Sequence, residues 1–340
     1  MFNLFVVLRT QIAVLLFCVC ASCTSPPNSI RVERTAFLMG TMAHFVIETH
    51  DRQDGLILLE QMVTTMEDVE AEISTWRDSS AFGRFNQLPV GESMLLPERS
   101  CKWLEEITYW WAESDGVFDP AVGGLIDSWG LRTTGHRPTT KELNLIVERG
   151  GFKSIHFDAN QCMMTRLADV SLDAGGFGKG AALDAVYKMM DEESVAWMID
   201  FGGQVAVDND TWSVSLAHPA QRNEPILNFD LINGSLATSG GSERDLIMPD
   251  SSVIGHILNP LTGYPVQWSG SVTVWEMSAV NADVLSTILY VMGPDGGYDW
   301  AVERQITACF LIPHSDGGIM VKPTPEFEAQ FGISHSMLPA

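Results

Sequence analysis

The order in which helical and strand patterns follow one another constrains the fold of this chain more than any other feature. Apolar side chains recur at helical spacing in segments that predict helices at residues 54–73, 97–114, 140–149, 181–190 and 281–292. Strand patterns lie at residues 42–48, 170–172, 196–200, 205–207, 212–216, 226–232, 253–258 and 272–274. Because this order contains few strand–helix–strand repeats, it predicts an α+β domain rather than a doubly wound parallel sheet.

Composition and charge limit the partners of such a domain. The chain has 340 residues, of which 46% are hydrophobic, and its 43 acidic and 20 basic side chains leave a formal net charge of −23. The electric field of this negative charge repels a phosphate backbone, so we expect no nucleic-acid partner. A phosphorylated small ligand can still bind where backbone amides, a lysine and a divalent cation meet, so any nucleotide site is expected to depend on a metal.

The first 22 residues have the pattern of a signal peptide. An apolar stretch too short to span a bilayer follows Arg9, and Ala21-Ser22 precede Cys23 as small residues precede the lipidated cysteine of bacterial lipoproteins. We expect lipidation at Cys23; an ordinary cleaved signal peptide is the alternative, because Cys20 stands where leucine is usual. Residues 23–34 would be a tether and residues 35–340 one folded domain, on a membrane-anchored lipoprotein of the bacterial cell envelope that faces the periplasm or the exterior.

Three cysteines lie beyond this segment. Cys101, Cys162 and Cys309 are too far apart for a metal-binding CxxC motif. One pair could form a disulfide in an oxidising compartment, but the sequence does not indicate which pair. Buried free thiols are the expected state.

A glycine-rich segment at residues 171–180 joins a predicted strand to the helix at residues 181–190. Glycines let the backbone approach a ligand closely, and a helix N-terminus offers unpaired amides to an anion. The residue after Lys179 is glycine rather than the serine or threonine of a Walker loop, and the glycine spacing does not fit GxGxxG. Taken alone, the segment is explained better by a tight structural turn.

Two further patterns could supply a cation site and a base. Asp283 and Thr287 are four residues apart in a predicted helix, so their oxygens share one face and suit Mg²⁺. A capping carboxylate and a buried threonine are the alternative. His256 stands before the turn at Asn259-Pro260, where it could accept a proton near neutral pH, although such a histidine is more often only hydrogen-bonded.

Each pattern is ambiguous alone, but their order along the chain is distinctive. The motifs are Met39-Gly40-Thr41, Ser74-Thr75-Trp76-Arg77 with Ser80 and Phe85-Asn86, residues 116–120, residues 173–180 with Asp184, Gly202-Gly203, Thr238-Ser239-Gly240, residues 256–263, and Ala282-Asp283 with Thr287. With them the sequence resembles the ApbE family of FAD:protein FMN transferases over about residues 35 to 312. The resemblance implies a single mixed α/β domain related to the T-fold, with a cleft for its substrate FAD.

The resemblance also implies roles for individual residues. The positions expected to bind FAD are Met39, Trp76, Val117, Phe118, Asp119, Asp173, Lys179 and Ile257. Trp76 would be the stacking surface for a flavin or adenine ring. Asp283, Thr287 and a backbone carbonyl of the glycine turn, that of Gly176, would hold Mg²⁺. The chain departs from the family pattern at Phe177-Gly178 and at Asn259, which bears on nucleotide contacts more than on the class of enzyme.

The implied reaction is the Mg²⁺-dependent transfer of FMN from FAD to a threonine or serine hydroxyl of an acceptor flavoprotein, with a phosphoester formed and AMP released. His256 is the first candidate for the general base and Asp173 the second. Two alternatives remain: metal-dependent hydrolysis of FAD to FMN and AMP, and a non-catalytic lipoprotein that binds FAD. A carrier needs only the aromatic and glycine surfaces, so the presence of His256 together with Asp283 and Thr287 favours catalysis.

Overall fold

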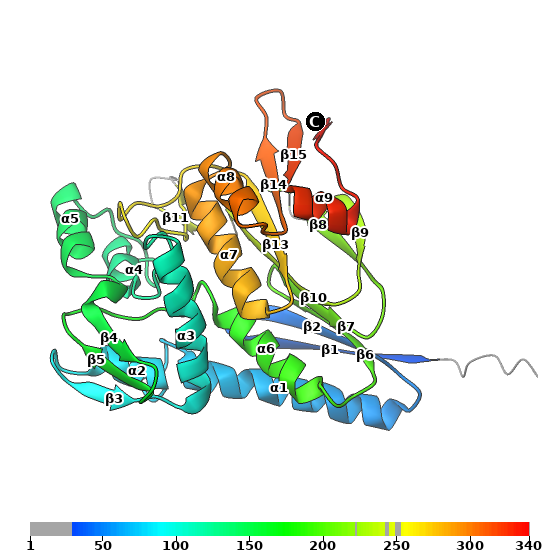
Figure 1. The fold of residues 1–340 in the computed structure, drawn as a ribbon, viewed down its shortest axis with the longest axis horizontal. Helices are drawn as coiled ribbons and strands as arrows, with labels where there is room; N and C mark the ends of the chain where they lie inside the picture. The colour runs from blue at the N-terminus through cyan, green and yellow to red at the C-terminus, as the bar shows by residue number, and fades with distance from the viewer. Residues whose placement is uncertain (1–28, 222, 242–244, 249–252, 340) are drawn as a thin grey trace, which may run out of the picture.

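A nine-stranded sheet forms the centre of the computed structural model, which describes residues 29–339 except 222, 242–244 and 249–252 (Figure 1). Neighbouring strands all pair antiparallel, in the order β1-β2-β6-β7-β10-β13-β14-β15-β16. These strands are β1 (Ile30–Leu38), β2 (Thr41–Thr49), β6 (Ala196–Phe201), β7 (Gln204–Asp208), β10 (Gly234–Gly240), β13 (Ser271–Glu276), β14 (Ala308–Pro313), β15 (Ile319–Pro323) and β16 (Ser336–Leu338). The predicted α+β class is therefore confirmed.

Three helices pack against one another on one face of this sheet: α1 (Arg52–Ile73), α6 (Gly178–Met190) and α7 (Ala279–Met292). Asp51 caps α1 by accepting hydrogen bonds from the amides of Gln53 and Asp54. The apolar stripe of α1 that the sequence predicts is buried. Helix α7 is buried on nearly every side, because α6, α3 (Glu98–Glu113) and α8 (Gly296–Glu303) pack on it as well as strands β10 and β13.

The opposite face of the sheet is covered by the hairpin of β8 (Trp212–Ala217) and β9 (Pro225–Leu231) and by helix α9 (Pro325–Phe331). Side chains alternate between the two faces along β2. Phe45 and Ile47 join the core under the three helices, whereas Val46 joins the core under the hairpin.

The chain between α1 and α6 forms a lobe beside the sheet (Figure 1). Its elements are α2 (Ala81–Gln87), β3 (Ser93–Leu95), α3 (Glu98–Glu113), α4 (Gly123–Trp129), α5 (Thr140–Arg149), a 3₁₀ turn (Phe152–Ser154), β4 (Ile155–Asp158) and β5 (Met163–Arg166). Trp110 of α3 donates a hydrogen bond to Asn281 of α7 (2.7 Å), and apolar residues of the lobe join the core under the helices. The lobe and the helical layer therefore meet along α7.

Three short elements of the last third of the sequence remain: β11 (Leu246–Ile247), β12 (Val253–Ile254) and α8 (Gly296–Glu303). Only Val253 and Ile254 of the strand predicted at residues 253–258 form a strand. Residues 170–172 are not in a strand either, because the partner of Leu172 is the side chain of Asn86 and not a neighbouring strand. Strand β1 begins at Ile30, inside the predicted tether of residues 23–34, because this segment pairs with the end of β2.

The cysteines differ from expectation at one pair. Cys101 and Cys162 form a disulfide between α3 and the turn before β5, so the prediction of free thiols is wrong for them. Cys309 is a buried free thiol, and burial raises its pKa to about 12. The predicted signal peptide and Cys23 lie outside the described residues. Among the helices that are described, none combines the length and the apolar character needed to cross a membrane.

Candidate functional site

The glycine-rich turn before α6 is held by hydrogen bonds from two other segments. Asn86 of α2 clamps Leu172: its Nδ2 donates to the Leu172 carbonyl (3.0 Å) and its Oδ1 accepts from the Leu172 amide (2.7 Å). The amide of Asp173 donates to the Pro120 carbonyl (2.8 Å), and its Oδ1 accepts from the Gly175 amide (2.7 Å). The turn is therefore fixed before it enters the helix.

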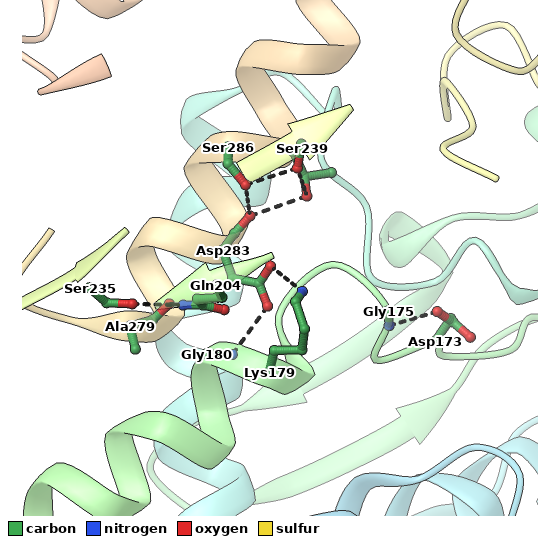
Figure 2. A network of polar contacts seen from close by, with 11 residues as sticks. Asp173, Gly175, Lys179, Gly180, Gln204, Ser235, Ser239, Ala279, Asp283 and Ser286 are labelled. Carbon is green, nitrogen blue, oxygen red and sulfur yellow. Dashed lines mark hydrogen bonds and ion pairs between the residues drawn. The ribbon is translucent and has the colours of Figure 1, made fainter. Parts of the chain in front are cut away.

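The N-terminus of α6 lies directly against α7. A Cβ on Gly180 would collide with the backbone of Ala279, so this approach requires glycine. It brings the Gly180 amide to 3.1 Å from Asp283 Oδ2 and Lys179 Nζ to 2.8 Å from Asp283 Oδ1 (Figure 2). Asp283 is only 3% exposed. A buried carboxylate is costly unless it is paired, and the Lys179 ammonium supplies the counter-charge.

Hydroxyl groups continue this polar cluster along α7. Thr287 Oγ1 and Ser286 Oγ both donate to the Asp283 carbonyl, at 3.1 and 2.9 Å. Ser239, on β10, lies 2.9 Å from Ser286 Oγ and 3.5 Å from Thr287 Oγ1. A Cβ on Gly176 would stand 3.7 Å from Thr287 Oγ1, so the glycine turn lies beside this hydroxyl. The three residues predicted to hold Mg²⁺ are thus neighbours.

This donor set fits a hard cation. It offers a carboxylate, a hydroxyl and a peptide carbonyl, all of them oxygen ligands that Mg²⁺ accepts. Within the described ranges no three His, Cys, Asp or Glu side chains are grouped to hold a metal. The set at Asp283 is a candidate because of the chemistry of its own oxygens. The Lys179 ammonium shows that a positive charge is accommodated at Asp283 Oδ1. Ser278 is the N-cap of α7, so Asp283 does not cap its own helix, but its carboxylate accepts from the Gly180 amide at the start of α6.

An arginine joins Trp76 to the glycine turn. Arg132 Nη2 donates to Thr75 Oγ1 (2.7 Å) and forms an ion pair with Asp173 Oδ2. The guanidinium carbon lies over the indole, 4.9 Å from the ring centre of Trp76, whose side chain remains 71% exposed. Both Asp173 oxygens therefore accept hydrogen bonds within the protein, so this carboxylate helps to hold the glycine turn.

Met39 contacts the N-terminus of α6 from the turn between β1 and β2. Its backbone is in the left-handed region (φ +47°), and its amide donates to Glu70 Oε2 (3.2 Å). Its Cε would stand 3.1 Å from a Cβ on Gly178. The predicted FAD residues Met39 and Lys179 are therefore brought to the same helix end.

The loop at residues 117–119 supports the turn from the side of the lobe. The buried ring of Phe118 lies against Gly176, where a Cβ would be 3.0 Å from Phe118 Cε2. The Asp119 carboxylate accepts from the amides of Ala121 (2.7 Å) and Phe152 (2.9 Å), and burial raises the pKa of Asp119. Val117 is half-buried against the main core. The side chains of Phe118 and Asp119 are thus engaged with the protein itself.

His256 lies in a cleft of about 650 Å³. Asp245 Oδ1 accepts from the His256 amide (3.0 Å) and lies 2.7 Å from His256 Nδ1. Because an ionised carboxylate only accepts hydrogen bonds, Nδ1 donates to Asp245, which orients the His256 ring. Gly240 also lines this cleft and directly follows Ser239 of β10, so the cleft adjoins the cluster around Asp283. Ile257, the last of the predicted FAD residues, lines the same cleft.

Two residues of the candidate site carry no signal in the sequence. Arg132 follows the left-handed Gly130 that ends α4, and its partners Thr75 and Asp173 are distant in the chain. Asp245 is one acidic residue among many, and only the fold brings it to His256. Asn86, by contrast, stands in a motif that the sequence analysis singled out.

The comparisons with known proteins identify the family and the fold. The model of the ApbE family matches residues 39–311. The FAD:protein FMN transferase of Salmonella typhimurium is 26% identical over 309 residues, 85% of this chain and 86% of that protein. The enzyme of the same name from Haemophilus influenzae is 26% identical over 284 residues, 79% of this chain and 82% of that protein.

Solved structures show the same fold. The ApbE protein of Thermotoga maritima superposes with a TM-score of 0.80 over 88% of this chain and 99% of that chain, at 24% identity. The apo form of the flavinyl transferase ApbE from Pseudomonas stutzeri superposes with a TM-score of 0.78 over 90% of this chain and 98% of that chain, at 22% identity.

Proposed function

The chain belongs to the ApbE family, and from that premise we propose that it is an FAD:protein FMN transferase. The match to the family over residues 39–311 confirms the resemblance that the order of the motifs indicated. The observation that carries the proposal is one junction. The glycine turn and the α6 N-terminus meet the Asp283 cluster of α7, and a cleft with a histidine paired to a carboxylate adjoins them.

The reaction that we propose exchanges one phosphate bond for another. The hydroxyl oxygen of a threonine or serine on an acceptor flavoprotein attacks the phosphorus on the FMN side of the FAD pyrophosphate. The bond from that phosphorus to the bridging oxygen breaks, AMP leaves with the electron pair, and FMN stays on the acceptor through a phosphoester. The hydroxyl proton passes to a base on the enzyme.

Asp283, Thr287 and the Gly176 carbonyl would hold Mg²⁺ in this mechanism. When bound, the ion supplies positive charge that offsets the charge of the pyrophosphate and of the departing AMP. Lys179 lies 2.8 Å from Asp283, so its ammonium is placed to contact phosphate oxygens at the same junction. A protein with a net charge of −23 needs such local cations to hold an anionic substrate.

His256 is the base that we propose. Asp245 orients the ring through Nδ1, the arrangement by which a carboxylate commonly fixes a catalytic imidazole. Asp173 is the weaker candidate, because Arg132 and the Gly175 amide already occupy its oxygens. Trp76 would stack on the flavin or adenine ring of FAD.

We also propose that the protein is anchored at a membrane surface and works outside the cytoplasm. The apolar segment before Cys23 supports this location. The disulfide between Cys101 and Cys162 supports it independently, because such bonds persist in oxidising compartments. Cys23→Ser should release the protein from the membrane fraction, and a serine variant that still fractionates wholly with membranes would contradict the anchor.

The experiment that tests the function combines purified protein, FAD, Mg²⁺ and a candidate acceptor flavoprotein. Flavin fluorescence on the denatured acceptor and release of AMP in equal amount are expected. AMP with free FMN and no labelled acceptor would indicate hydrolysis, and FAD recovered intact would indicate a carrier. His256→Ala should keep FAD affinity but slow single-turnover transfer by about 10²–10⁴-fold. An undiminished rate would remove His256 from the mechanism.

A further inference from the structure

Arg132 has a place in the site that the reaction chemistry does not explain. Its guanidinium lies over the exposed indole of Trp76, yet the same group is tied by Nη2 to Thr75 and Asp173. These partners come from two segments, the turn after α1 and the glycine turn. One side chain therefore couples an exposed aromatic ring to the loop beside the candidate metal ligands.

The restraints on Arg132 bear on ligand binding. An exposed tryptophan samples several rotamers, and a ligand that stacks on it must bear the entropy of fixing it. Arg132 places a cation against the ring and is itself held by a hydroxyl and by a carboxylate that the Gly175 amide also binds. Arg132 thus links the exposed Trp76 ring to the glycine turn without a ligand being present.

We propose that Arg132 is a positioning residue for FAD: it holds the Trp76 ring in the orientation on which a flat ring of the ligand stacks. The inference rests on the proposed function, because FAD supplies that ring. Arginine suits this task better than lysine, since its planar group can stack on an indole while its nitrogens donate to other groups.

The test is a double-mutant cycle on FAD affinity, measured by titration of flavin fluorescence without an acceptor. Trp76→Leu should weaken binding about tenfold, the size expected for loss of one stacking surface. Arg132→Gln should weaken it about three- to tenfold when Trp76 is present and less than twofold when Trp76→Leu is already present. An equal loss in both backgrounds would show that Arg132 does not act through Trp76 and would overturn the inference.

Two further variants separate positioning from a general effect on the fold. Arg132→Lys keeps a positive charge near Asp173 but not the planar group, so it should restore the melting temperature and only part of the FAD affinity. Full restoration of affinity would show that charge alone matters. Arg304 lies over Trp300 at 4.3 Å, a comparable pair on α8, and Arg304→Gln should leave FAD affinity unchanged. A loss like that of Arg132→Gln would make the effect nonspecific and contradict the proposal.

Titrations with FMN and with AMP identify the ring that stacks. The loss caused by Arg132→Gln should appear with only one of them, FMN if the isoalloxazine lies on Trp76 and AMP if the adenine does. A loss with neither would overturn the inference. Failure of the inference and failure of the proposed function can be told apart. Wild-type protein that does not bind FAD would contradict the transferase. Equal effects of Arg132→Gln with and without Trp76, in a protein that does transfer FMN, would contradict only the role of Arg132.

Discussion

Helices α6 and α7 each place a carboxylate at the N-terminus of the other helix. Of the two carboxylates, Asp283 alone also binds an ammonium group. Asp184 of α6 accepts from the amides of Ala279 (2.6 Å) and Val280 (3.1 Å) and from a serine hydroxyl at the start of α7. Asp283 of α7 accepts from the Gly180 amide at the start of α6, and in addition it binds the Lys179 ammonium. Both satisfy amides that a helix start leaves unpaired.

From this difference we propose that Asp184 is a structural carboxylate and Asp283 a functional one. The amide and hydroxyl partners of Asp184 belong to the fold and cannot leave it. The ammonium partner of Asp283 sits at the end of a flexible side chain, so another cation can take its place. Thr287 and Gly176 lie beside Asp283 and would add oxygen ligands for a cation, whereas the hydrogen-bond partners of Asp184 are two amides and a hydroxyl of its own fold. We therefore expect both residues to matter for stability and only Asp283 to matter for turnover.

Matched asparagine variants test that expectation and should give the largest effect. Asp283→Asn removes the one anionic ligand, so flavin transfer should fall about 10³-fold, the loss expected when several kcal/mol of transition-state charge stabilisation disappear. Asp184→Asn should lower the free energy of unfolding by about 1–3 kcal/mol, because the amide cannot accept all the donors at α7. Its turnover should stay within about threefold of wild type. Similar losses of turnover in both variants would abolish the distinction.

Lys179→Met sharpens the comparison through the metal. It leaves Asp283 buried with only the Gly180 amide, which should cost about 3–5 kcal/mol of stability. Mg²⁺ should then raise the melting temperature more in the variant than in wild type, where the ion must displace the ammonium. Ser278→Ala, which removes one donor from Asp184, is the control and should show no added response to Mg²⁺. An equal Mg²⁺ response in wild type and Lys179→Met would contradict the exchange of cations at Asp283.

The sequence predicts this region unevenly, for a physical reason. Periodicity reports how a segment buries its own face, so α1 and the α+β class follow from it. The pairing of Asp184 with the start of α7 joins residues 95 positions apart and depends on how the helices cross on the sheet. Gly180 illustrates the limit. Position 180 requires glycine because the backbone of Ala279 lies where a Cβ would stand, and no local sequence pattern reveals that contact.

The site shows the same limit. The order of the motifs indicated the family, and it named Asp283, Thr287 and Gly176, which the fold does place together. It missed Arg132 and the disulfide of Cys101, because a lone arginine and a widely spaced cysteine pair have no spacing rule. The apolar pattern of residues 170–172 also predicted a strand. The pattern is the same whether the hydrogen-bond partner of the Leu172 backbone is a neighbouring strand or the side chain of Asn86.

Thr287→Ala should give a smaller effect on turnover. It removes a neutral ligand, so transfer should fall about tenfold, and added Mg²⁺ should restore part of it while the melting temperature stays near that of wild type. Ser286→Ala is the matched control, since Ser286 donates to the same carbonyl but is fully buried. A loss that Mg²⁺ does not relieve would place Thr287 outside the cation site. Transfer by wild type that persists after exhaustive chelation with EDTA would reject the metal at Asp283 altogether.

The smallest effect is the pH dependence of Asp184. Burial raises the pKa of Asp184 above its ordinary value of 3.8. The Asp184 carboxyl group therefore keeps its proton to a higher pH in the folded protein than in the unfolded chain. Protonation of Asp184 stabilises the folded state fully at a pH below its pKa in the unfolded chain, and this stabilisation is lost as the pH rises through its pKa in the folded protein. Asparagine does not titrate. The free energy of unfolding of wild type relative to Asp184→Asn should thus increase as the pH is lowered from 7 into the acidic range, measured by urea unfolding.

The difference between the two proteins cancels the titration of the other carboxylates they share. A wild-type advantage that shrinks in acid would show that the amides and hydroxyl at the start of α7 outweigh burial, and would make Asp184 a carboxylate held in its charged form.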